Sequence, residues 1–123
     1  MRGITRSRYV AFIVLLSALA GCEAQPQGGG IGNPDAGRVA IASVGCGVCH
    51  LIPGIPGATG IVGPSLRDFA GRTLIGGTHV NEPSVLVAWV RDAPELSPDT
   101  GMPRMPLSQQ EARDVAAYLY TLR

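Results

Sequence analysis

The sequence predicts a small all-α domain of three to four short helices, preceded by a leader that is removed. Apolar residues recur at helical spacing in three segments, and each of these segments begins with residues that favour a helix start. No alternating apolar and polar run indicates a strand, and Gly and Pro are frequent between the helical segments. A chain of this length has room for one domain at most.

The first 21 residues are expected to be a lipoprotein signal peptide. Three arginines among the first eight residues form a basic region, and residues 10–20 form an apolar run that is short for a permanent membrane helix. The run ends in Leu19-Ala20-Gly21-Cys22, which resembles the bacterial signal whose cysteine becomes the lipidated N-terminus. The alternative is an ordinary cleaved signal that leaves Cys22 as a free thiol. We expect an exported protein, anchored through lipid on Cys22 to the periplasmic side of a bacterial membrane.

Residues 22–32 are expected to form a flexible tether, and residues 33–123 the folded domain. The tether is rich in Gly, Gln and Pro and has no periodicity. From Cys22 onward the chain has 7 Arg, no Lys and 9 Asp and Glu, so 7 − 9 gives a net charge of −2. The absence of a basic stripe argues against nucleic acid as a partner, and electrostatic steering of other partners is expected to be weak.

The first helix is expected to begin at Asn33-Pro34-Asp35. Asn can cap a helix, Pro suits the first helical position, and Asp is favourable near the positive end of the helix dipole. The helix is predicted to continue to the cysteines with one apolar face: Gly37, Ala40, Ile41 and Val44. Residues 51–66 are rich in Gly and Pro and predict a long loop, a kind of segment that is usually functional in a small domain.

Two further helices follow. Residues 81–84 begin the second, and Pro94 is expected to end it soon after Asp92; its apolar face is Val85, Leu86, Trp89 and Val90. Residues 93–107 form another Pro-rich loop. The last helix begins at a capping box, Ser108-Gln109-Gln110-Glu111, and its apolar face is Ala112, Val115, Ala116, Leu119 and Leu122.

The five residues Cys46-Gly47-Val48-Cys49-His50 carry the main functional signal. Cys-x-x-Cys-His is the attachment pattern of a c-type haem, in which each thiol adds to one vinyl group and the imidazole binds the iron. A structural zinc site usually needs four Cys and His ligands, and only His79 remains outside the motif. A redox dithiol of the thioredoxin kind needs strands around it, and none is predicted. The pattern therefore favours one covalent haem c.

An iron atom bound by one histidine has an open sixth position, which Met, a second His or nothing can occupy. Met102 and Met105 lie in the Pro-rich loop far along the chain from His50, where the loop can close over the opposite face of the haem. Met102 lies between Gly101 and Pro103, and the proline limits how far the loop relaxes. We expect a methionine ligand.

The chain resembles a class I monohaem cytochrome c, and is most similar to the cytochrome c domains associated with subunit II of bacterial cytochrome c oxidases. The resemblance covers about Gly37 to Leu122 and includes five motifs: Cys46 to His50, Gly63-Pro64-Ser65-Leu66, Trp89-Val90-Arg91-Asp92, Gly101-Met102-Pro103 and Ala117-Tyr118-Leu119. The chain has no copper-binding half, so it is not the oxidase subunit itself.

The resemblance implies a role for each matching residue. Cys46 and Cys49 would carry the thioethers, and His50 would be the proximal iron ligand. The Pro64 carbonyl would accept a hydrogen bond from the other ring nitrogen of His50. Met102 would be the distal ligand. It also implies that Gly37 and Tyr118 lie where the first and last helices cross.

Several side chains keep two interpretations. Met105 is a second thioether in the distal loop, where the family usually has one, so it competes with Met102. Trp89 is expected in the core, although its indole N–H could also reach a haem propionate. Arg72 is either a propionate partner or solvated. His79 is expected at the surface or the haem edge rather than on the iron, and Tyr120 on a helix surface.

The predicted function is the transfer of single electrons by a membrane-tethered carrier that is not an enzyme. Its partners would be a redox donor and acceptor in a respiratory chain, with a cytochrome c oxidase as a candidate. One alternative is a haem subunit bound permanently in an oxidoreductase complex. Another is a haem enzyme or gas sensor, which would need an open distal position.

Overall fold

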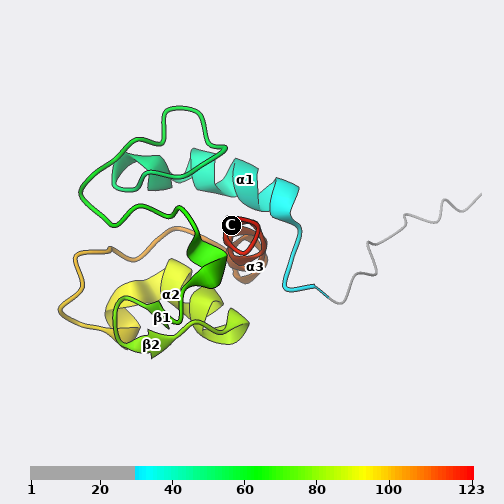
Figure 1. The fold of residues 1–123 in the computed structure, drawn as a ribbon. Coiled ribbons are helices and arrows are strands. Elements are labelled where there is room, and N and C mark those ends of the chain that lie inside the picture. Colours follow the sequence, from blue (N-terminus) through cyan, green and yellow to red (C-terminus); the bar gives the residue numbers. More distant parts are fainter. Residues whose placement is uncertain (1–29) are drawn as a thin grey trace, which may run out of the picture.

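The computed structural model describes residues 30–123 (Figure 1). The proposed signal peptide, Cys22 and most of the tether lie outside the described residues. Three helices, two short 3-10 turns and a two-stranded hairpin follow one another along the chain, so the predicted all-α class is confirmed. Within residues 30–123, no helix is both long and apolar enough to cross a membrane.

Helix α1 spans Pro34–Ser43 and begins as predicted. The Asn33 side chain caps it by accepting hydrogen bonds from the backbone N–H groups of Asp35 (2.9 Å) and Ala36 (3.2 Å). The helix was predicted to reach the cysteines, and this is wrong. It ends at Ser43 because Gly45 takes a left-handed conformation with φ +76°, which a helix cannot include. The cysteines follow in a separate 3-10 turn, η1 (Cys46–Val48).

Helix α2 spans Pro83–Leu96 and is kinked. Asp92 has φ −150° and ψ 69°, outside the helical region, and Pro94 begins one further turn. The predicted end near Asp92 is therefore a kink, because proline cannot continue the first segment but is well suited to the start of the next.

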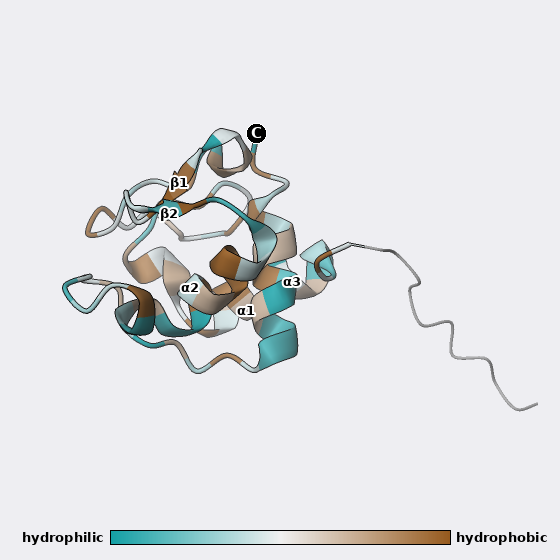
Figure 2. Cartoon of the chain, turned by 90° about the horizontal axis from the view of Figure 1, so that it is seen from below, coloured by the Kyte–Doolittle hydropathy of each residue, from teal (hydrophilic) through white to brown (hydrophobic). Residues whose placement is uncertain are grey.

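Helix α3 spans Gln109–Leu119 and begins at the predicted capping box. The Ser108 hydroxyl accepts from the Glu111 N–H, and the Glu111 carboxylate accepts from the Ser108 N–H. The whole predicted apolar face is buried: Ala112, Val115, Ala116, Leu119 and Leu122. Figure 2 shows hydrophilic residues (teal) on the outer side of α3.

Helices α1 and α3 pack most closely against each other, and α2 covers another side of α3. A Cβ atom on Gly37 would overlap the Asp114 backbone, so glycine is what lets the two helices approach. Just before α1, Ile31 packs against the core and Gly32 against the Arg113 backbone, so the chain is already fixed to α3 there.

A hairpin lies between α1 and α2, where the sequence predicts no strand. Strands β1 (Leu74–Ile75) and β2 (His79–Val80) pair antiparallel, and Gly76 and Gly77 supply the positive φ angles of the turn. Two residues per strand are too few for an alternating pattern, which is why the sequence gives no strand signal. The 3-10 turn η2 (Phe69–Gly71) precedes this hairpin.

The two Gly- and Pro-rich loops lie at the same end of the molecule. Figure 1 shows loop 51–66 (green), which follows η1, and loop 97–107 (gold to orange), which joins α2 to α3, both on the side away from the N-terminal trace. The motif with the cysteines and the loop with the methionines are therefore carried to one end by the helices behind them.

Candidate haem-binding site

The Cys-x-x-Cys-His motif forms one tight turn. The Cys46 carbonyl accepts hydrogen bonds from the N–H groups of Cys49 (3.2 Å) and His50 (3.0 Å). Both cysteines and His50 are half-buried, and neither thiol is in a disulfide. The turn thus holds two reduced thiols and one imidazole within five residues.

The orientation of His50 is fixed by loop 51–66. Its Nδ1 lies 2.7 Å from the Pro64 carbonyl oxygen, as the resemblance implied. Because a carbonyl oxygen only accepts, Nδ1 carries the proton and the lone pair lies on Nε2. That tautomer is the one in which Nε2 can bind a metal ion.

Glycine is required beside the imidazole. A Cβ atom on Gly63 would overlap the His50 ring, and one on Gly60 would overlap the backbone of Val48 and Cys49. Loop 51–66 therefore packs directly onto the motif. It does so because its close contacts are made by residues without side chains.

Backbone hydrogen bonds fasten the same loop to the motif. Gly60 donates to the Gly47 carbonyl (3.1 Å), and Gly63 donates to the Cys49 carbonyl (2.8 Å). At the other end of the loop, the Tyr118 hydroxyl of α3 donates to the Pro53 carbonyl (2.7 Å). The sequence does not reveal this role of Tyr118, since the loop has no periodicity that places its carbonyls.

Burial raises the pKa of the Cys46 thiol, and the neighbouring Cys49 adds to the rise. A hydrogen bond with the Cys46 backbone lowers this pKa, but by less than burial raises it. Cys46 is therefore a neutral thiol near neutral pH in the unreacted protein, and it is less prone to oxidation than a free exposed cysteine.

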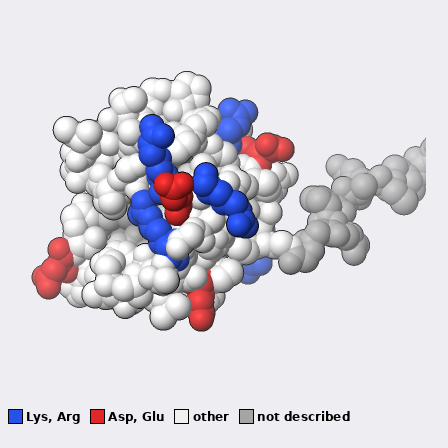
Figure 3. All heavy atoms as spheres, viewed as in Figure 1, with Lys and Arg blue, Asp and Glu red and all other residues white. Residues whose placement is uncertain are grey.

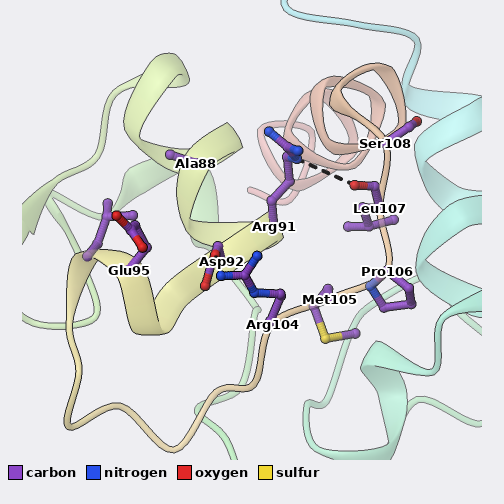
Figure 4. A pocket seen from close by; sticks show the side chains of 10 residues that line it. Ala88, Arg91, Asp92, Glu95, Arg104, Met105, Pro106, Leu107 and Ser108 are labelled. Carbon is purple, nitrogen blue, oxygen red and sulfur yellow. Dashed lines mark hydrogen bonds and ion pairs between the residues drawn. The ribbon is translucent and has the colours of Figure 1, made fainter.

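The two methionines have different surroundings. Met102 is half-buried, and its N–H donates to the Thr100 hydroxyl (3.2 Å). Met105 is half-buried beside α2, and its N–H donates to the Arg91 carbonyl (2.8 Å). Figure 4 shows Met105 among the residues that line a surface pocket between α2 and loop 97–107. Both side chains pack against the core, but the Met105 backbone is bonded to α2, whereas the Met102 backbone is bonded within the loop.

Trp89 and His79 form a pair between α2 and the hairpin. Trp89 is buried, which confirms its predicted place in the core, and Gly76 leaves no room for a Cβ atom beside its ring. The His79 and Trp89 ring centroids are 5.6 Å apart, and His79 Nε2 lies 3.0 Å from the Ser97 hydroxyl. His79 is therefore held by protein groups at the start of loop 97–107.

Arg72 is not freely solvated. Its guanidinium donates to the carbonyls of Ser65 and Arg67, and it lies 5.6 Å from the centre of the Phe69 ring. It connects the end of loop 51–66 to the turn η2.

Tyr120, which was predicted on a helix surface, is half-buried at the end of α3. Its ring packs edge-on against Phe69 with centroids 6.1 Å apart, and its hydroxyl donates to the Asn81 side chain (2.8 Å). Burial raises the pKa of Tyr120, and the Glu82 charge adds to this rise. The sequence does not reveal these contacts, because Tyr120 caps the end of α3, where the helical period no longer tells which side a residue faces.

One ion pair near the methionines was not expected from the sequence. The Arg104 guanidinium lies 2.5 Å from the Asp92 carboxylate, and the two residues also form an antiparallel backbone bridge. Arg91 and Asp92 belong to a motif of the resemblance, but no sequence pattern pairs them with residues 104–107.

The donor set fits a c-type haem. Two reduced thiols, an imidazole with a free Nε2 and a thioether on a separate loop are the groups that such a cofactor needs. Among residues 30–123, no three His, Cys, Asp or Glu side chains come together as a zinc site would require. Within the described residues the motif also lies outside any βαβ unit, which leaves the thioredoxin-type alternative without support.

The surface around the motif is uncharged. Residues 39–66 contain no Asp, Glu, Lys or Arg, and Val48, Ile61 and Val62 are 77%, 92% and 83% exposed. Figure 3 shows charged side chains (blue and red) near the centre and the upper right of this face, whereas its upper left edge is white. Attraction between charges therefore contributes little on this side.

Comparison with known proteins gives one family. The family model described as Cytochrome c matches residues 35–123, which include the motif, both loops, α2, α3 and all of α1 except its first residue. Comparison with curated proteins gave no match.

Proposed function

The chain belongs to the cytochrome c family, and we propose that it is a membrane-tethered carrier of single electrons whose haem iron is bound by His50 and Met102. Membership in the family implies one covalently bound haem c and a role in electron transfer; its members are typically carriers rather than enzymes. The ligands, the tether and the cellular role are the parts that we propose.

The observation that carries the proposal is the contact between His50 and Pro64. It fixes the imidazole in the tautomer with a free Nε2, next to two reduced thiols. We assign the thioethers to Cys46 and Cys49, the proximal ligand to His50 and the distal ligand to Met102. The bound haem would supply the one-electron chemistry, and a thioether ligand favours Fe(II) and raises the reduction potential.

The remaining residues keep this coordination unchanged between the two oxidation states. Loop 51–66 is hydrogen-bonded to the motif at Gly60 and Gly63, and Tyr118 fastens it to α3. A site held in this way reorganises little when an electron arrives or leaves. That property suits a carrier, whereas a gas sensor or peroxidase needs a vacant position.

We further propose that the protein acts in a bacterial respiratory chain on the periplasmic side of the membrane. The apolar leader and Cys22 support a lipid anchor, and the resemblance to oxidase-associated domains supports a terminal oxidase as acceptor. The uncharged side around the motif supports a partner that docks without strong charge attraction.

The test of the carrier is spectroscopy with voltammetry on the purified holoprotein. We expect a weak sulfur-to-iron charge-transfer band in the near infrared and one reversible one-electron wave, with no cyanide complex at low cyanide concentration. A ferric protein that lacks the band and binds cyanide at once would show an open distal site, and the carrier proposal would fail.

Replacing Cys22 by Ser is expected to release the protein from the membrane. The thioether that holds the lipid needs a cysteine sulfur. Several acyl chains anchor a protein stably, whereas a protein without lipid has no such anchor. Fractionation of cells followed by mass spectrometry of the mature N-terminus measures both effects. The control is Ser17→Ala in the leader, which leaves Cys22 intact. A Cys22→Ser protein that matures normally and stays in the membrane fraction would contradict the lipid anchor.

A further inference from the structure

The kink in α2 is the place where loop 97–107 is attached. At Asp92 the backbone leaves the helical conformation (φ −150°, ψ 69°) and forms an antiparallel bridge with Arg104. Immediately before the kink, the Arg91 carbonyl accepts a hydrogen bond from the Met105 N–H (2.8 Å). The carbonyl of a regular helix would be used within the helix, so the kink frees backbone groups for the loop.

Side chains reinforce the same attachment. Arg104 reaches from the loop to the Asp92 carboxylate at 2.5 Å, as Figure 4 shows, with side chains that are 74% and 22% exposed respectively. Arg91 donates to the Leu107 carbonyl (3.4 Å) and to the Gln109 side chain (2.6 Å) at the start of α3. The Arg91–Asp92 pair, here called the α2 clamp, thus holds the loop at residues 104–107.

Met102 lies between the α2 clamp and a second attachment point at Ser97 and Thr100. On one side, only Pro103, whose φ is fixed by its ring, separates it from Arg104. On the other side, the Met102 N–H is bonded to Thr100, and the Thr100 N–H donates to the Ser97 carbonyl (3.0 Å) at the end of α2. Few backbone torsions between the two attachment points are free to change.

We propose that Asp92 and Arg104 are positioning residues for the distal ligand: their pairing fixes the register of loop 97–107, so that Met102 rather than Met105 faces the iron. This inference rests on the proposed His50 and Met102 coordination. The Met105 N–H is bonded to the Arg91 carbonyl at the clamp, so the Met105 backbone is held at α2 while the clamp is closed. The Met102 N–H is instead bonded within the loop, to the Thr100 hydroxyl, and no backbone bond joins Met102 to α2.

The test compares Asp92→Asn and Arg104→Gln holoproteins with the wild type by cyanide titration of the ferric form. Cyanide binds when the methionine leaves the iron, so its apparent association constant reports how often the loop opens. We expect a rise of roughly two- to fivefold in each variant, the scale that a partly exposed ion pair supports. In the double variant the rise should be no larger than in either single variant, because the two residues act as one pair.

The matched control variants change the net charge by the same amount but leave the α2 clamp and Arg104 intact. Asp99→Asn neutralises another acid of the same loop, and Arg113→Gln neutralises an exposed arginine of α3; neither residue is in an ion pair among residues 30–123. Both controls should leave the cyanide constant within twofold of the wild type. Combining Asp92→Arg with Arg104→Asp restores an ion pair and should bring the constant back toward the wild-type value.

The outcomes separate this inference from the proposed coordination. If the wild type has no sulfur-to-iron band, the coordination itself fails. If the wild type has the band but the clamp variants match their controls, the coordination stands and the positioning role is overturned. A rise that follows the urea unfolding midpoint in all variants, controls included, would also overturn it, because the effect would then come from global stability.

Discussion

We expect the Met102→Ala holoprotein to lose the sulfur-to-iron charge-transfer band, to bind cyanide readily and to fall in reduction potential. Alanine offers no donor atom, so the sixth position would be empty or filled by a weaker ligand, and the preference for Fe(II) would weaken. A fall on the order of 0.1 V or more is expected, within the roughly 0.8 V that axial ligands span. Near-infrared spectroscopy, cyanide titration and voltammetry measure the three effects.

Met105→Ala is the matched control, because it removes the same side chain three residues away. Met105 packs against the core beside α2, so its loss should leave the band and the potential in place. The cost should be stability alone, about 2 kcal/mol or less, since the side chain is only half-buried. Interchanged behaviour of the two variants would assign the iron to Met105. Retention of the band in both would exclude methionine ligation.

The Cys46→Ala, Cys49→Ala double variant is expected to contain no covalently attached haem. Each thioether needs one of the two sulfurs, and no other cysteine lies among residues 30–123. Each single variant should keep one bond and show weaker attachment. Haem staining of denaturing gels measures the attachment directly.

Val48→Ala is the control for this experiment. Val48 lies between the cysteines and is 77% exposed, so its truncation leaves the thiols and the fold in place and should leave haem staining unchanged. Haem that acidified organic solvent extracts completely from the wild type would show that no thioether forms. The assignment of Cys46 and Cys49 would then be wrong.

The sequence by itself determined the helix starts, the apolar faces of α2 and α3 and the haem-attachment motif. Helix caps and periodic apolar faces are local patterns, so Asn33 and the Ser108 capping box could be identified from neighbouring residues alone. The same holds for Cys46 to His50, whose spacing is set by one turn of backbone. The end of α1 was misjudged because one positive φ at Gly45, rather than the loss of a pattern, terminates it.

Only the tertiary structure decided which distant residues meet. The hydrogen bond from Tyr118 to Pro53 and the packing of Tyr120 on Phe69 join segments that share no sequence pattern. The attachment of Arg104 to the kink at Asp92 is of the same kind, and it is what distinguishes the surroundings of Met102 from those of Met105. The physical reason is that loops 51–66 and 97–107 have no period of their own. Their conformations are set by the carbonyls and side chains that the packed helices present to them.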